Sequence, residues 1–348
     1  MTPRVTVLMS VYNGERYLKA AIDSILNQSF RDFEFLIIED CSTDQSANII
    51  QTYGDERIRM VSNEVNLGLT KSLNRGLDLA RGAYVARMDA DDIALPDRLR
   101  LQVEFMENNP EYGMVGARRQ ILMGERLINR SEELFSDHES LCVLQLFRCG
   151  FVHSSVMMRT QLAKEVRYNE DFFAAQDYDL WVRLSRRAKI ANLPVALIQY
   201  RIHPDSISET RFQKQLETVQ HIHLEQLSRL GISHNQIETE SHLLVGLTMT
   251  GQVVGEQELL NAAKWLTKLL HHGSSKQLFS VLAWNHTIQY LWRGMFNRRN
   301  SNVPLLYLLK NWRHPLNQGL TTKAIIFLNC IKHFPLVLYV YSWWKNIR

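Results

Sequence analysis

The sequence predicts an α/β domain whose mostly parallel sheet is flanked by helices, and two observations lead to this fold class. Over the first hundred residues, short apolar runs alternate with helical patterns of about ten residues, which is typical of a parallel sheet with right-handed crossovers. Polar or acidic residues directly follow three of these runs. Because ligands of such sheets bind at the carboxyl ends of the strands, these residues mark the expected site.

The first part of the domain repeats a strand–helix unit. Strands are expected at 5–11, 33–40, 58–61 and 83–86, where the sequence is nearly continuously apolar. Helices are expected at 17–26, 46–53 and 70–80. In the first of these, apolar side chains recur every three or four residues, which predicts a helix with one buried face.

The second part of the domain, roughly residues 99–198, has a less regular pattern. We expect helices at 101–106, 138–147 and 180–188, and strands at 114–116, 126–128 and 191–200. The last strand carries the chain back toward the site.

Three acids, Asp89, Asp91 and Asp92, follow the strand expected at 83–86. Carboxylates this close would repel one another without a cation between them. Asp89 and Asp91 are two positions apart, so in an extended segment they point the same way and can share one ion. Hard carboxylate oxygens suit Mg²⁺ or Mn²⁺. The alternative is a solvated acidic turn that caps the helix expected to begin near Pro96.

In several segments, the chain resembles the family 2 glycosyltransferases of the GT-A fold. The segments, in order between about residues 4 and 210, are SVYNGERYL, IIEDCSTDQS, NLGLTKSLNRGLDLARGAY, ARMDADDIALPDRL, FVHSSVMMR, QDYDLWVRL and YRIHPDSIS. The resemblance implies transfer of one sugar from a nucleotide-diphosphate donor to an acceptor hydroxyl, with inversion at the anomeric carbon. The acids at 89–91 then match the family's Asp-x-Asp motif.

The resemblance assigns donor-binding roles along the strand ends. Asp40 would accept a hydrogen bond from the nucleobase, which favours uracil, and its alternative role is capping a helix. Gly68 would let the backbone approach the donor. Asp89 would reach the ribose or the metal, Asp91 would be the principal metal ligand, and Asp92 would hold the loop or the sugar.

Four further residues could contribute to the donor site. Ser10, Tyr12 and Asn13 end the first strand and would line the nucleoside, or they are plain turn residues. Arg87, two residues before Asp89, would neutralise the carboxylate cluster, or it is a surface arginine.

The catalytic base implied by the resemblance is Asp177. An acceptor hydroxyl must lose a proton as it attacks, and a carboxylate on the face opposite the leaving group can take it. Many relatives carry Glu where this chain has Gln176 on the acceptor side, so one neighbouring charge is absent. Asp179 would cap the helix at 180–188. The alternative makes both acids helix-start residues that the macrodipole favours.

Two histidines and one arginine complete the set. His203 matches a position that closes over the diphosphate, where it could ligate the metal while Arg201 pairs with phosphate oxygens. His153 matches a position that faces the donor sugar or the acceptor. For both histidines a purely structural role is the alternative.

The last ninety residues form a different kind of signal. Twelve Lys or Arg and no acid follow Glu258, and this stretch holds six of the seven tryptophans. Cations beside Trp and aliphatic side chains favour an anionic membrane surface. The apolar run 334–345 is shorter than the roughly 20 residues that a spanning helix needs. The alternative is a helical domain with an aromatic core and a basic face for a protein partner. No nucleic-acid module is recognisable, so nucleic acid is not expected.

We therefore expect a glycosyltransferase domain at 1–215 and a helical, basic and aromatic-rich region at 216–348. Within the first, 1–98 would bind the nucleotide sugar, and 99–215 would hold the acceptor side and the base. The cysteines have no CxxC spacing and no signal peptide is recognisable, which favours the cytoplasm and the inner face of the cell membrane.

Other functions remain as alternatives. A sugar nucleotidyltransferase would usually have a glycine- and arginine-rich first loop with a lysine, which VYNGERYL lacks. A non-catalytic scaffold of a polysaccharide-assembly complex would have little use for the intact acids. A processive synthase would usually carry several spanning helices and a Gln-x-x-Arg-Trp motif.

Overall fold

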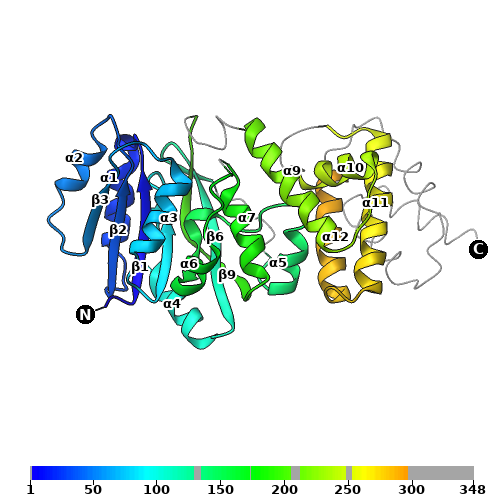
Figure 1. The fold of residues 1–348 in the computed structure, drawn as a ribbon, viewed down its shortest axis with the longest axis horizontal. Coiled ribbons are helices and arrows are strands. Elements are labelled where there is room, and N and C mark those ends of the chain that lie inside the picture. Colours follow the sequence, from blue (N-terminus) through cyan, green and yellow to red (C-terminus); the bar gives the residue numbers. More distant parts are fainter. Residues whose placement is uncertain (1, 129–134, 173, 205–211, 248–252, 297–348) are drawn as a thin grey trace, which may run out of the picture. The chain divides into compact units, whose positions relative to one another are not determined.

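The computed structural model describes residues 2–128, 135–172, 174–204, 212–247 and 253–296. These residues belong to two compact units, which meet in sequence between Gln226 and Leu227 and are taken one at a time (Figure 1). The tail beyond 296, with Trp312, Trp343 and Trp344 and the apolar run 334–345, lies outside the described residues.

The first unit is built on a sheet that has nine strands within the described part of the chain. Its parallel half is ordered β3-β2-β1-β4. These strands are β1 (Val5–Val11), β2 (Phe33–Glu39), β3 (Ile58–Ser62) and β4 (Tyr84–Met88). The four strands expected from the apolar runs are confirmed, with small shifts at their ends.

The other half of the sheet is mixed. Antiparallel pairing of β4 with β8 (Met157–Arg159) joins the halves. From β8 the order continues through β6 (Tyr112–Met123) and β9 (Lys189–Ile202) to β5 (Ile93–Ala94), and β7 (Arg126–Ile128) pairs with β6. β6 and β9 are parallel, whereas β5 and β9 are antiparallel. The predicted α/β architecture with a mostly parallel sheet is confirmed in its first half.

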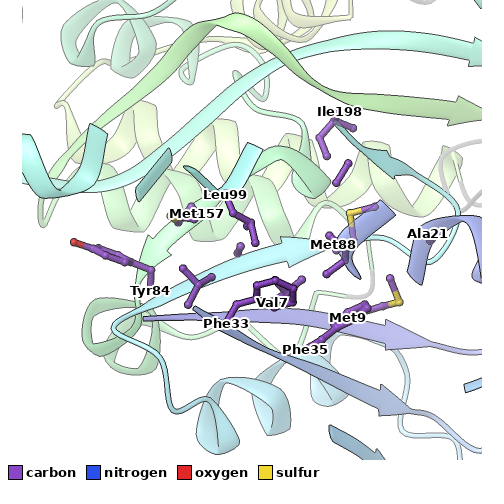
Figure 2. Close-up of a cluster of buried hydrophobic side chains, with 14 of the residues drawn as sticks. Val7, Met9, Ala21, Phe33, Phe35, Tyr84, Met88, Leu99, Met157 and Ile198 are labelled. Atoms are coloured by element: carbon purple, nitrogen blue, oxygen red, sulfur yellow. The ribbon is translucent and has the colours of Figure 1, made fainter. Parts of the chain in front are cut away.

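The main core lies between one face of the sheet and three helices. These are α1 (Glu15–Leu26), α2 (Ser46–Gln51) and α4 (Arg98–Asn108). Alternate residues of β1 and β2, among them Val7, Met9 and Phe35, point into this core (Figure 2). Burying a side chain of this size contributes about 1.5–3 kcal/mol, so this cluster contributes a large share of the unit's stability.

The opposite face of β1 is covered by α3 (Leu69–Leu79). Gly76 lets this helix come close, because a Cβ there would lie 2.2 Å from a methyl group of Leu8. α3 begins directly after Gly68, whose N–H donates to the Asp40 carboxylate just past the carboxyl end of β2 at 2.9 Å.

The remaining elements of the first unit are α5 (His138–Leu144), η1 (His153–Ser155), α6 (Thr160–Val166), α7 (Gln176–Ser185) and most of α9 (Phe212–Arg229). α7 packs on α9 through Tyr178, Val182 and Ile222. The helix expected at 180–188 begins four residues earlier, after Ala175 in a left-handed conformation. Capping by Asp179 was therefore wrong, because this carboxylate lies inside α7 and accepts from Arg183 at 2.9 Å.

The second unit contains α10 (Gln236–Gly246), α11 (Glu256–Ser275) and α12 (Val281–Phe296). A capping box of Asn235 and Glu238 starts α10. Trp265, Trp284 and Trp292 are at most 5% exposed. These three aromatic side chains are thus buried and are not part of an outward-facing surface. None of the helices that the structure describes has the length and apolar character to cross a bilayer.

Candidate active site

The three acids that follow β4 lie together at the carboxyl edge of the sheet. One carboxylate oxygen from each of Asp89, Asp91 and Asp92 lies within 4.8 Å of the others, and no other such acidic group occurs among the described residues. Asp89 and Asp91 are half-buried, whereas Asp92 is buried. Because oxygen ligands from two accessible carboxylates can converge on one point, this arrangement fits Mg²⁺ or Mn²⁺.

Arg87 is a buried residue, not the surface arginine of the alternative. Its guanidinium pairs with the Asp89 carboxylate, and its side chain is only 1% exposed. Burial raises the pKa of Asp89, with Arg87 opposing this shift and Asp91 adding to it. Arg87 therefore supplies a fixed positive charge directly behind the acidic cluster.

Asp92 fastens the acidic loop to two other elements. Its Oδ2 accepts from the Ser154 hydroxyl in η1, and its Oδ1 accepts from the Arg201 backbone N–H in β9 at 2.8 Å. Burial, followed by the charges of Asp89 and Asp91, raises the pKa of Asp92 well above its usual range. Asp92 is thus placed to hold the loop, one of its two expected roles.

The end of β9 and the residue after it bring Arg201 and His203 next to the acids. The Arg201 Nε donates to the Asp91 carbonyl at 2.8 Å, and the His203 Nε2 lies 2.9 Å from the Asp91 Oδ2. Pairing of Ile93 with Gln199 joins β5 to β9 next to these contacts. A metal held by Asp91 would therefore have an imidazole nitrogen within reach.

A second buried arginine, Arg98, holds the backbone just before the acidic residues 89–92. Its Nη2 donates to the Arg87 carbonyl at 2.6 Å, and its Nε donates to Gln102 at 3.2 Å. Gln102 in turn donates to the Ser155 carbonyl at 2.7 Å. Burial and the nearby Arg87 charge lower the pKa of Arg98 to about 9. Sequence reasoning missed this residue, although it lies within the segment ARMDADDIALPDRL.

Asp40 orders the loop that precedes α3. Its Oδ1 accepts from Asn63 at 2.6 Å and from the Leu67 N–H at 2.9 Å, and its Oδ2 accepts from the Gly68 N–H at 2.9 Å. Gly68 has a φ of +85°, a conformation that L side chains rarely adopt. A contact between Asp40 and a nucleobase stays a prediction.

The residues that follow β1 and β2 are joined by hydrogen bonds. Asn13, at φ +50°, accepts from the Thr43 N–H at 2.8 Å, and its own N–H donates to Ser42 at 3.1 Å. Tyr12 beside it is 51% exposed and Ser10 is half-buried. Of these three expected nucleoside-lining residues, Tyr12 and Asn13 are therefore exposed, whereas Ser10 is only partly so.

The candidate base Asp177 and the acceptor-side residues Gln176 and His153 form a second set, apart in the sequence from the acidic cluster. Asp177 is half-buried in the first turn of α7, and burial raises its pKa. Gln176 is 5% exposed. The Nε2 of His153 lies 2.8 Å from the Tyr168 hydroxyl, and burial followed by the Arg87 charge lowers the pKa of His153 well below its usual range. His153 is therefore a neutral side chain near neutral pH.

The charges of Arg87 and Asp89, in and beside the acidic cluster, also affect the pKa values on the acceptor side. Arg87 lowers the pKa of Asp177, and Asp89 raises it. Arg87 also contributes to the lowered pKa of His153. The candidate base therefore lies within electrostatic range of the acidic cluster.

Comparison with known proteins supports a family assignment. The model of the family "Glycosyl transferase family 2" matches residues 6–167. An uncharacterized glycosyltransferase of Haemophilus influenzae is 34% identical over 257 residues, which cover 69% of this chain and 80% of that protein. The Escherichia coli UDP-Glc:alpha-D-GlcNAc-diphosphoundecaprenol beta-1,3-glucosyltransferase WfgD is 26% identical over 213 residues, 60% of this chain and 81% of that protein.

Two solved structures share the fold. S. aureus TarS 1-349, solved in complex with UDP-GlcNAc, superposes with a TM-score of 0.55 at 17% identity, over 85% of this chain and 89% of that one. The mannosyltransferase PcManGT from Pyrobaculum calidifontis, solved with GDP-Man and Mn²⁺, gives 0.52 at 17% identity, over 86% and 87%. Together with the sheet topology, these findings show that the chain belongs to glycosyltransferase family 2 and has the GT-A fold.

Proposed function

We propose that this glycosyltransferase moves one sugar from a nucleotide-diphosphate sugar, with a UDP-sugar favoured, to a hydroxyl of a lipid-linked or surface-polysaccharide glycan. The reaction inverts the anomeric centre in a metal-assisted displacement. The carrying observation is the convergence of Asp89, Asp91, Arg201 and His203 at the carboxyl edge of the sheet. The name of the relative WfgD, a transferase from UDP-Glc to a diphosphoundecaprenol-linked sugar, supports this donor and acceptor class.

At the donor side, Asp91 and Asp89 would hold Mn²⁺ or Mg²⁺, with His203 as a third ligand. A metal bound there would neutralise part of the diphosphate charge. The neighbouring structure solved with GDP-Man and Mn²⁺ supports a metal in this fold. Arg87 keeps the acids from repelling one another, and Asp92 holds the loop through Ser154 and the Arg201 backbone.

At the acceptor side, Asp177 would take the proton of the attacking hydroxyl. Its raised pKa makes it a stronger base than an ordinary aspartate. Gln176 and the neutral His153 would shape the pocket around the acceptor. Ser10, Tyr12, Asn13, Asp40 and Gly68 would line the nucleoside end.

The test is product analysis with purified protein, Mn²⁺, UDP-glucose or UDP-GlcNAc, and a bacterial lipid extract. We expect release of UDP together with a glycosylated lipid. In Asp177→Asn, we expect UDP affinity within about twofold of the wild type and a rate lower by about 10²–10⁴. Release of pyrophosphate instead would indicate a nucleotidyltransferase, and absence of any turnover or nucleotide binding would indicate a scaffold.

We further propose a catalytic domain at 1–215 and a membrane-associating region at 216–348, which would place the protein at the inner face of the cell membrane. After Glu258 the chain has twelve Lys or Arg and no acid, and this positive charge supports the placement. Among the tryptophans of this region, the buried Trp265, Trp284 and Trp292 do not contribute to such a surface. The membrane contact would therefore depend on the cations and on the tail.

A further inference from the structure

The aromatic ring of Tyr17 collects two guanidinium groups and one imidazole. The Arg201 guanidinium carbon lies 4.5 Å from the ring centroid, and that of Arg16 lies 5.0 Å from it. The His203 ring centroid is 5.0 Å away, at an interplanar angle of 51°. Tyr17 and Arg16 belong to α1, whereas Arg201 lies near the end of β9 and His203 directly follows that strand, so this ring joins two segments that are far apart in the sequence.

Within the described part of the chain, neither arginine forms an ion pair with an acid. No carboxylate of the residues in the structure's described ranges lies within 4.0 Å of the Arg16 or Arg201 guanidinium. The Arg201 guanidinium donates to the carbonyl oxygens of Asp91 at 2.8 Å and Gly124 at 3.2 Å. Two like charges that share one ring repel each other, so the group carries an excess of positive charge that an anion would relieve.

The location of Arg16 strengthens this conclusion. Arg16 is exposed in the first turn of α1, where the helix dipole favours an anion and disfavours a cation. A bound anion would interact favourably with the guanidinium and with the helix terminus together. The other side of the group borders Asp91, the expected principal metal ligand.

We propose that Arg16 and Arg201 form a paired site for the diphosphate of the donor, with Tyr17 as the aromatic platform that positions both guanidinium groups. This proposal rests on the proposed function and assigns Arg16 a phosphate-binding role. Planar guanidinium groups stack on aromatic rings and still present N–H donors to phosphate oxygens.

The proposal also describes what these groups would do in the transfer. The acceptor oxygen bonds to the anomeric carbon and its proton goes to Asp177. As the bond from that carbon to the diphosphate oxygen breaks, the electron pair stays on the departing oxygen. Arg16 and Arg201 would face this growing charge from outside the acidic cluster.

The experiment is calorimetric titration of UDP and UMP, each with Mn²⁺, into the full chain and its variants. In Arg16→Gln, we expect about tenfold weaker UDP binding, because the variant lacks the charge-assisted contact to the second phosphate. UMP does not carry that phosphate, so its affinity should stay within about twofold of the wild type. Tyr17→Phe keeps the ring and should bind UDP like the wild type. Tyr17→Leu removes the platform and should lose about as much UDP affinity as Arg16→Gln.

Arg31→Gln is the matched control. Arg31 is an exposed arginine just before β2, at the opposite end of the strands, and donates to the Leu26 carbonyl at 3.0 Å. It should bind both nucleotides like the wild type. Thermal melts should show that all variants fold.

The outcomes separate this proposal from the proposed function. An Arg16→Gln variant that binds UDP unchanged, or loses UDP and UMP affinity equally, overturns the diphosphate site while the transferase assignment stands. A wild-type protein that binds none of UDP, GDP and dTDP with Mn²⁺ overturns the proposed function and this site with it.

Discussion

Asp177 combines a raised pKa with an expected role as base, and this combination has a consequence for the pH dependence. The base must be ionised, and burial makes protonation easier than for an ordinary aspartate with a pKa of about 3.9. We therefore expect kcat/KM to fall on the acidic side with a midpoint above that ordinary value. A pH–rate profile with saturating Mn²⁺ checks this, and a profile that stays flat down to pH 4 contradicts it.

Asp91 gives a second prediction at this scale. Among the three acids it pairs with His203 and is the expected principal metal ligand. In Asp91→Asn, we expect the gain in UDP affinity that Mn²⁺ gives the wild type to disappear, whereas binding measured in EDTA should change little. Calorimetry with and without Mn²⁺ measures both values. An unchanged gain would remove Asp91 from the metal site.

Single residues were predictable where their neighbours in the sequence carry the chemistry. The close spacing of Asp89, Asp91 and Asp92 predicts a cation site or an acidic turn, and the structure brings the three carboxylates together. Arg98 and Tyr17 could not be found in this way. Their contacts, with the Val156 carbonyl and with Arg201, join segments that lie far apart in the sequence.

At the level of the elements, the start of β4 determines where the acids emerge. Gly82 lies two residues before this strand begins at Tyr84, and a Cβ there would lie 2.4 Å from the Thr6 nitrogen and 2.6 Å from the Val5 carbonyl carbon. Both atoms belong to the backbone of β1. Because backbone cannot rotate aside as a side chain does, β4 would have to move away from its partner strand.

We therefore expect Gly82→Ala to lower the free energy of unfolding by about 1–3 kcal/mol, the usual cost of overpacking. Gly54→Ala is the matched control, because a Cβ at Gly54 meets nothing within 4 Å. It should change stability by less than about 0.5 kcal/mol. Urea unfolding of both variants measures the difference, and equal stabilities would contradict the close approach.

Elements were predictable where apolar periodicity is uninterrupted. β1 to β4 are short apolar runs with polar turns at both ends, and their positions follow from that pattern. β6 was expected at 114–116 but extends to Met123. Its middle carries Arg118 and Arg119, and the Arg119 guanidinium packs over the Tyr200 ring at 5.0 Å. A tertiary contact thus replaces the apolar side chains that a strand pattern requires.

At the scale of the whole molecule, charge is divided unevenly along the chain. Thirty-six acids and twenty-eight of the forty Lys and Arg lie before Leu259, and only cations follow. If the proposed membrane contact holds, cutting the chain near Gln318 should release most of the protein from anionic vesicles at low salt, because four cations and two tryptophans are removed. Co-sedimentation measures the bound fraction. Undiminished binding of the shortened chain would contradict a role for the tail.

The whole-molecule arrangement was only partly predictable. The sequence pattern indicated a parallel sheet, and that holds for β3, β2, β1 and β4. It did not indicate the antiparallel β8 or the pairing of β6 with β9, because these depend on partners that a local pattern does not encode.

The narrow junction between the halves of the sheet has a practical consequence for recombination between relatives. Only Tyr84–Arg159, Val85–Met158 and Ala86–Met157 pair β4 with β8, and Arg98 reaches from α4 to carbonyls on both sides of that seam. A chimaera that imports the stretch from β6 to β9 should fold and keep its nucleotide preference if it retains these strand partners and Arg98. The stretch from β6 to β9 could then be exchanged between relatives to change acceptor choice. A chimaera that instead takes on the nucleotide preference of the relative that supplied this stretch would show that the halves are not interchangeable.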